Sequence, residues 1–200
     1  ASWSAQFASE SIFELIMTPT QNDLGSSSLY SFLCPKYIYS SATAGAVAGT
    51  DFIENCLAED PNDVRWGVMD IDEYDKKPGA SRIPDRRGWI KKYYGDGKST
   101  TSATNVKVIR LSEVYLTGAE AALKKSSPDL DKAVEWLIET RKRSPSLSAA
   151  TTADTDLEEK ILTERRKELI AEGHRYFDQM RLGRTVTFDE SLLGEPVLPP

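Results

Sequence analysis

Residues 108–145, VIRLSEVYLTGAEAALKKSSPDLDKAVEWLIETRKRSP, decide the fold. In the first part of this stretch, apolar side chains recur at steps of three and four residues, which is the spacing of one helix face. These side chains are Val108, Leu111, Tyr115, Ala119 and Ala122. A second apolar stripe begins after Pro128 and ends before Pro145, as a second helix would. Because the connection is short, the two helices are predicted to pack as an antiparallel hairpin.

The second helix has a pattern seen in helical repeats. Ala133, Leu137 and Pro145 stand at the offsets of a small residue, a large residue and a proline in the second helix of a tetratricopeptide repeat. Trp136 is expected to pack against the hairpin partner. Repeats bury their faces against neighbouring repeats, so further stacking partners are expected upstream of residue 1.

Two more helical segments follow the hairpin. Thr155 to Glu158 fit a capping box, in which a threonine oxygen caps free amides and a glutamate reaches back. Gly173 is predicted to interrupt or end the third helix. The segment from His174 to Gly183 is again amphipathic, with Tyr176, Phe177 and Met180 expected to be buried.

The composition changes near residue 104. Residues 1–103 hold eight of the 12 glycines and 13 of the 18 aromatic residues, with many turn signals. Short strands are predicted at Ser11–Thr18 and Trp89–Tyr94, and a surface loop at Ser40–Thr50. The fold class is therefore mainly α, with TPR-like antiparallel hairpins, a loop-rich region and a few short strands.

The composition excludes some classes of protein. The formal net charge of −6 argues against a nucleic-acid partner, which would favour a basic surface. No apolar run approaches the roughly 18 residues needed to span a bilayer. The start, Ala1 to Ser4, lacks the features of a signal peptide, so the chain is expected to be a fragment.

Catalytic templates are absent from the sequence. The one histidine, His174, excludes HExxH, and there is no GxSxG, GxGxxG or GxxxxGK[ST]. Many acidic residues are present, but nothing selects the pair that a glycoside hydrolase needs. Asp70, Asp72 and Asp75 depart from the calcium-loop template. We expect no enzymatic activity, no cofactor and no metal, and we expect Cys34 and Cys56 to be unpaired.

Aromatic residues on loops are the better indication of function. Sugar rings present apolar C–H faces to flat aromatic side chains, while their hydroxyls need polar partners. The candidate ligand-binding residues are Tyr30, Tyr37, Tyr39, Trp66, Trp89, Tyr93 and Tyr94. Each of them could equally be a core residue.

Several stretches resemble the C-terminal part of SusD/RagB outer-membrane nutrient-binding lipoproteins. The most specific is Ile161–Gly183, ILTERRKELIAEGHRYFDQMRLG, which resembles the family signature. Val108–Ala121, Ala133–Pro145, Glu10–Leu15 and Val197–Pro199 are similar to further family motifs in the same order. In this stretch, opposite charges three or four residues apart favour a salt-bridged helix face. Because the stretch is the family's signature, the resemblance implies an internal structural network around Glu164, Arg165, Glu172, Arg175 and Asp178.

The resemblance implies an organisation and a role. Residues 1–200 would form one SusD-like C-terminal region: a ligand-facing part at 1–103, helical hairpins at 104–183 and an extension at 184–200. The N-terminal half and its lipid anchor would be missing from this chain. The family binds oligosaccharides or other nutrients on the bacterial surface and covers a SusC-like TonB-dependent transporter barrel. The alternative left open is a helical-repeat scaffold that binds another protein without a glycan site.

Overall fold

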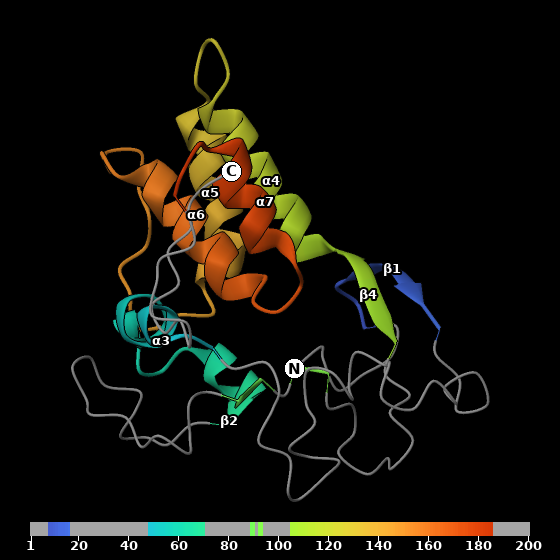
Figure 1. Ribbon diagram of the computed structural model, residues 1–200. Coiled ribbons are helices and arrows are strands. Elements are labelled where there is room, and N and C mark those ends of the chain that lie inside the picture. The colour runs from blue at the N-terminus through green and yellow to red at the C-terminus, as the bar shows by residue number, and fades with distance from the viewer. Residues whose placement is uncertain (1–7, 17–47, 71–88, 91, 94–104, 186–200) are drawn as a thin grey trace, which may run out of the picture.

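The computed structural model describes residues 8–16, 48–70, 89–90, 92–93 and 105–185. Helices dominate these residues, as predicted, and short strands accompany them (Figure 1). The main helices are α4 (Leu111–Leu123), α5 (Leu130–Arg141), α6 (Leu157–Glu168) and α7 (His174–Arg181). Residues 40–47 of the loop predicted at 40–50, and the acidic residues at 72 and 75, lie outside the described residues. The end of that predicted loop is wrong, because Ala48 is buried and α3 begins at Thr50.

The hairpin of α4 and α5 forms the first core. Its buried residues are Leu116, Ala119, Ala122, Ala133 and Leu137, joined by Ala150 from the segment before α6 and by Leu157 and Ile161 of α6. Asp129 caps α5 by accepting a 3.1 Å hydrogen bond from the Lys132 backbone N–H. At Gly118 a Cβ would lie 2.6 Å from the ring of Trp136, so glycine lets the tryptophan pack against α4. The predicted antiparallel hairpin is confirmed.

The predicted first helix is wrong at its start. Val108 lies in a strand, β4 (Val106–Arg110), and α4 begins only at Leu111. β4 pairs antiparallel with β1 (Ser11–Leu15), which confirms most of the predicted strand at 11–18. β-branched side chains suit an extended, half-exposed strand better than a helix. A ribbon of two strands therefore leads directly into the hairpin.

Both ends of α6 differ in detail from the sequence predictions. The capping box at Thr155 is wrong, because Asp156 is the N-cap residue and no side chain caps the helix. The nearby Asp154 instead accepts a bond from the Thr151 N–H and pairs with Lys160 at 2.7 Å. The predicted end at Gly173 comes too late, because α6 ends at Glu168; Gly173 is the N-cap residue of α7 and has φ of 85°, in the left-handed region that favours glycine.

The predicted burial of α7 is wrong. Tyr176, Phe177 and Met180 are 52%, 69% and 44% exposed, whereas Asp178 and Gln179 are each 8% exposed. The inward side of α7 is therefore polar, because Asp178 faces a guanidinium of α6 at 3.3 Å. The apolar side of this amphipathic helix faces outward among the described residues.

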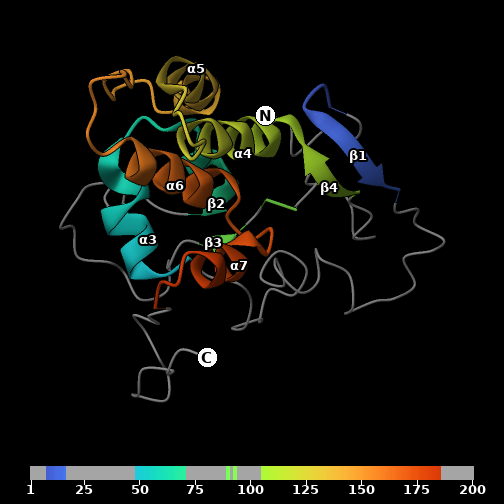
Figure 2. The ribbon, with the colours of Figure 1, turned by 90° about the horizontal axis from the view of Figure 1, so that it is seen from above.

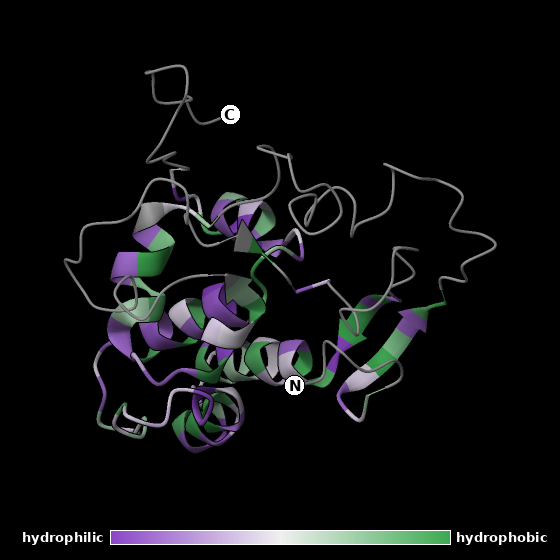
Figure 3. Ribbon diagram, turned by 90° about the horizontal axis from the view of Figure 1, so that it is seen from below, coloured by the Kyte–Doolittle hydropathy of each residue, from purple (hydrophilic) through white to green (hydrophobic). Residues whose placement is uncertain are grey.

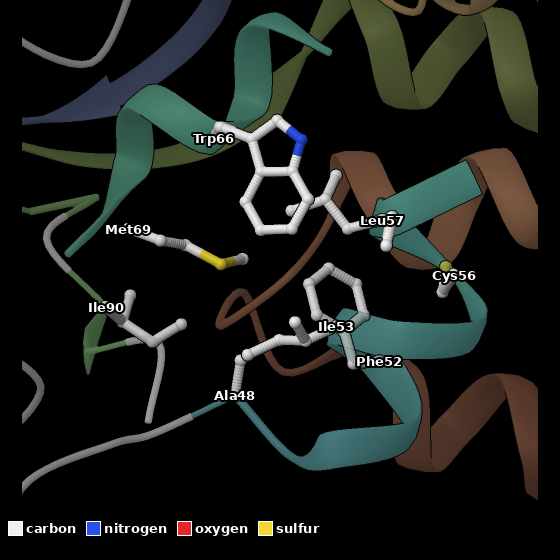
Figure 4. Close-up of a cluster of buried hydrophobic side chains, with 9 residues drawn as sticks. Ala48, Phe52, Ile53, Cys56, Leu57, Trp66, Met69 and Ile90 are labelled. Atoms are coloured by element: carbon white, nitrogen blue, oxygen red, sulfur yellow. The ribbon is translucent and has the colours of Figure 1, made fainter. Parts of the chain in front are cut away.

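A second core lies beneath the helices. It contains Ala48, Phe52, Ile53, Cys56, Leu57, Ala58, Trp66, Met69 and Ile90 (Figure 4). Apart from Ala48 and Cys56, which flank α3, these residues come from α3 (Thr50–Asn55), the 3₁₀ turns η2 (Leu57–Glu59) and η3 (Val64–Val68), and the strands β2 (Met69–Asp70) and β3 (Trp89–Ile90). β2 and β3 pair antiparallel, so the predicted strand at 89–94 is confirmed for its first two residues.

Candidate functional site

The aromatic residues predicted to bind ligand fall into two groups. Tyr30, Tyr37, Tyr39 and Tyr94 lie outside the described residues, and Trp89 is placed only by its backbone in β3. Trp66 and Tyr93 are each 5% exposed. The Trp66 Nε1–H donates to the Asp60 carbonyl at 3.0 Å, and the Tyr93 hydroxyl donates to the Ala171 carbonyl at 3.1 Å. These positions favour the core alternative for both residues, while ligand contact by the seven candidates stays a prediction.

Buried charges fix the segment that joins α6 to α7. Arg110 donates to Glu168 at 2.8 Å and to Glu172 at 2.5 Å, and it is 1% exposed. Lys92 Nζ donates to Glu172 at 2.5 Å and to the Ile170 carbonyl at 3.0 Å. The last turn of α6 and residues 169–173 are thereby tied to β4 and to the chain around Lys92.

A second buried cluster ties η3 to α6. The Arg65 guanidinium contacts Asp63 at 2.7 Å and Glu164 at 2.6 Å, and it donates to the Ser144 hydroxyl at 3.0 Å. Burial alone would raise the pKa of Glu168, but the guanidinium groups of Arg143 and Arg110 outweigh burial and hold this pKa at about 2. Glu168 is therefore ionised at neutral pH.

Lys92 is a buried cation whose pKa is also shifted. Burial lowers its pKa to about 8, although the carboxylate of Glu172 opposes this shift.

The predicted charge network exists as separate groups. Glu164 pairs with Arg65, Glu172 pairs with Arg110 and Lys92, and Arg165 pairs with Asp178. Arg175 forms no ion pair with the described residues, so its predicted place in the network is not filled.

A pocket of about 350 Å³ lies between α3, α6 and α7. Figure 2 shows these helices from above, with α7 starting near the C-terminal end of α6 and turning back beside it. The apolar lining of the pocket comes from Phe52 and from residues 169–171. The edge of the pocket is formed by Gly173, His174 and Tyr176. Its charged lining consists of Arg165, Arg166, Arg175 and Asp178. The buried charges described above hold residues 169–173 in place and so shape this pocket.

The contacts within the pocket leave polar groups and an aromatic face available. Arg166 pairs with Asp51 at 2.5 Å and lies 5.6 Å from the centre of the Phe52 ring. His174 Nδ1 is 3.7 Å from a carboxylate oxygen of Glu113. Tyr176 is half exposed, so a flat aromatic face and guanidinium donors meet in one concave place. Such a combination suits the apolar faces and hydroxyls of a sugar.

Local sequence patterns could not predict this pocket. Its parts are far apart in the chain: Asp51 and Arg166, which pair beside it, are 115 positions apart. Tyr176 was expected to be buried, and Arg175 was assigned to an internal network. The one local signal was the amphipathic pattern of residues 174–183, whose apolar side was assigned to the wrong environment.

The described residues offer little support for a metal site, a reactive thiol or a membrane-spanning helix. Within the described ranges, no group of three or more His, Cys, Asp or Glu side chains could hold a metal ion. Cys56 is a free buried thiol, and burial raises its pKa to about 11, so little thiolate forms at neutral pH. Cys34 lies outside the described residues. No helix among the described residues has both the length and the apolar character to span a membrane.

Residues 84–191 match the model of the SusD family. A SusD superfamily protein from Bacteroides thetaiotaomicron VPI-5482 has 31% identity and a TM-score of 0.75, over 95% of this chain and 41% of that chain. A second SusD superfamily protein, from Bacteroides vulgatus ATCC 8482, has 31% identity and a TM-score of 0.70, over 94% of this chain and 40% of that chain. None of the curated proteins matches the chain.

A more distant structure shares the fold. Surface glycan-binding protein A from Bacteroides thetaiotaomicron, in complex with laminarihexaose, has 22% identity and a TM-score of 0.61, over 88% of this chain and 43% of that chain. At this identity the likeness concerns the fold alone. The chain spans about two-fifths of the length of the structures that it matches.

Proposed function

This chain belongs to the SusD family, since its residues 84–191 match the family model, and from that premise we propose that it binds oligosaccharides without altering them. The observation that carries the proposal is the pocket between α3, α6 and α7, where the exposed face of Tyr176 and the guanidinium groups of Arg166 and Arg175 line one concavity. The laminarihexaose complex of surface glycan-binding protein A supports the proposal, because that protein holds a glycan on the same fold.

The wider role is part of the same proposal. We propose that the full protein is lipid-anchored at the surface of the outer membrane and delivers its ligand to a SusC-like TonB-dependent barrel. The loop aromatics Tyr30, Tyr37, Tyr39, Trp89 and Tyr94 would extend the binding surface beyond the pocket. Residues 1–103 would then be the ligand-facing part, and residues 104–183 the supporting hairpins.

The first test is retention of the 200-residue chain in native gels that contain neutral and charged polysaccharides. We expect retention in at least one gel, and we expect Tyr176→Ala to weaken it about fivefold or more, because stacking of a ring on an aromatic face contributes on the order of 1 kcal/mol. Phe177→Ala is the matched control, since Phe177 lies on the same helix, is more exposed and does not line the pocket.

The outcomes of this test are distinct. Equal loss in the two variants would remove the pocket from the proposal, and absence of retention in every gel would overturn glycan binding by this chain. Chromatography of the oligosaccharide after long incubation provides a second readout. Shortened products would overturn the non-catalytic part of the proposal.

One observation favours the alternative of a protein-binding scaffold. Large apolar side chains are exposed along β1, β4 and α7, including Ile12, Phe13, Val108 and Phe177. Figure 3 shows hydrophobic residues along the two strands, which project away from the helices. A scaffold would bind a protein partner through these faces. Phe177→Ser would then abolish recovery of that partner, and no saccharide would retain the parent chain.

A further inference from the structure

The pocket carries more positive charge than its carboxylates neutralise. Arg165 is paired with Asp178 at 3.3 Å, and Arg166 is paired with Asp51 at 2.5 Å. Arg181 shares Asp178 at 2.9 Å and also pairs with Glu120. Arg175 lines the pocket but pairs with none of the carboxylates in the part of the chain that the structure describes. One guanidinium is therefore left over for a ligand.

The surroundings of Arg175 make this surplus unusual. The formal net charge of the chain is −6, so a locally positive pocket stands against the charge of the whole protein. Partial burial and the neighbouring guanidinium of Arg166 both lower the pKa of Arg175. An anion bound beside Arg175 would relieve that repulsion, and a carboxylate or sulfate can accept two parallel hydrogen bonds from one guanidinium.

We propose that this pocket binds an acidic saccharide, with a carboxylate or sulfate group against Arg175 and the sugar ring against Tyr176. The inference rests on the proposed function and narrows its ligand class. It uses the geometry of one pocket: a surplus guanidinium, a second guanidinium on Arg166 and an exposed aromatic face. A neutral glycan would use the aromatic face but would leave the surplus charge without a partner.

The experiment compares native gels that contain polygalacturonate, κ-carrageenan or laminarin, which supply a carboxylate, a sulfate ester and a neutral glucan. We expect the parent chain to be retained by polygalacturonate or κ-carrageenan, and Arg175→Gln to weaken that retention about fivefold or more. Arg175→Lys keeps the charge but loses the planar fork, so its retention should be intermediate. The matched control is Lys125→Gln, which removes an exposed charge from the turn between α4 and α5 and should change nothing.

Each outcome decides the inference. Retention by only one acidic polymer identifies the group that Arg175 binds. Equal retention of the parent and Arg175→Gln by the acidic polymers would overturn the inference. Retention by laminarin alone would overturn it and leave the proposed function standing. Absence of retention in all three gels would overturn the inference, and absence of retention in every gel of the first test would overturn the proposed function as well. The acidic retention should weaken as the salt concentration rises, because salt screens exposed charges.

Discussion

Glu168 is a residue whose charge was visible in the sequence and whose partners were not. The carboxylate is 5% exposed and contacts Arg110 at 2.8 Å, Arg143 at 3.4 Å and Arg65 at 3.6 Å. These guanidinium groups come from β4, from the segment just after α5 and from η3. Because breaking a buried ion pair leaves an uncompensated charge, we expect Glu168 to stabilise the junction of these elements strongly.

The pH dependence of stability tests this role of Glu168. Its pKa in the folded chain is about 2, below the ordinary 4.5, so its contribution is complete above pH 4.5 and is lost as the pH falls toward 2. The lowered pKa corresponds to about 3 kcal/mol. We expect the free energy of unfolding in urea to fall over this window, and Glu168→Gln to lower it at pH 7 and to reduce the slope.

The control for this measurement is Glu135→Gln, since Glu135 is an exposed carboxylate on α5. That variant should keep both the stability and the acid slope of the parent chain. An unchanged slope in Glu168→Gln would mean that other carboxylates account for the loss of stability in acid.

Single aromatic residues could be identified from the sequence but not assigned to an environment. Trp66 and Tyr93 sit in loop-rich sequence, yet both are buried and use their polar atoms within the chain. Tyr176 has the helical spacing of a buried residue and is half exposed. Exposure depends on contacts between segments that are distant in the sequence, so residue type and spacing could not decide it.

Among the elements, the helices that carry long apolar stripes were predictable. The hairpin of α4 and α5 follows directly from the spacing of its apolar residues, and Ala119, Ala133 and Leu137 are fully buried as that spacing predicts. The boundary between β4 and α4 was not predictable, because Val108 fits both an alternating and a helical pattern. Pairing of β4 with β1, a partner near the start of the chain, decides in favour of the strand.

Gly118 tests the packing of the hairpin. A methyl group at this position would meet ring atoms of Trp136 at 2.6 and 2.7 Å, and overpacking of this kind costs about 1–3 kcal/mol. We expect Gly118→Ala to lower the free energy of unfolding, although alanine favours a helix by about 1 kcal/mol over glycine. Urea denaturation followed by circular dichroism measures the change.

A double-mutant cycle isolates the clash. With Trp136→Leu in place the ring is gone, so Gly118→Ala should become neutral or stabilising. The comparison position is Gly67, where no atom lies within 4 Å of an added Cβ and where alanine should cost little. Equal effects of Gly118→Ala with and without Trp136 would contradict the contact.

At the scale of the whole molecule, family membership was predictable from a few motifs, but the pocket was not. The signature at 161–183 supplies part of the pocket, and α3 supplies the rest from the other side of the sequence. The buried pair Arg65–Glu164 joins α6 to η3, and the partly exposed pair Arg166–Asp51 joins α6 to α3. A pattern within one segment carries no information about such pairs, which explains why the candidate site had to come from the fold.

The exposed apolar side chains of β1 and β4 indicate that this ribbon is covered in a longer chain. Ile12, Phe13, Val108 and Ile109 on the two-stranded ribbon are each more than 40% exposed, and a ribbon of two strands is marginally stable in water. We propose that further polypeptide, present in chains of the relatives' length, covers these faces. Amide hydrogen exchange by mass spectrometry should then show β1 and β4 exchanging at least about 30-fold faster in the 200-residue chain than in a chain of that length, since protection by about 2 kcal/mol slows exchange by that factor. Amides of α4 around Leu116 should exchange equally in both, and equal protection of β1 and β4 would mean that the ribbon is stable without a cover.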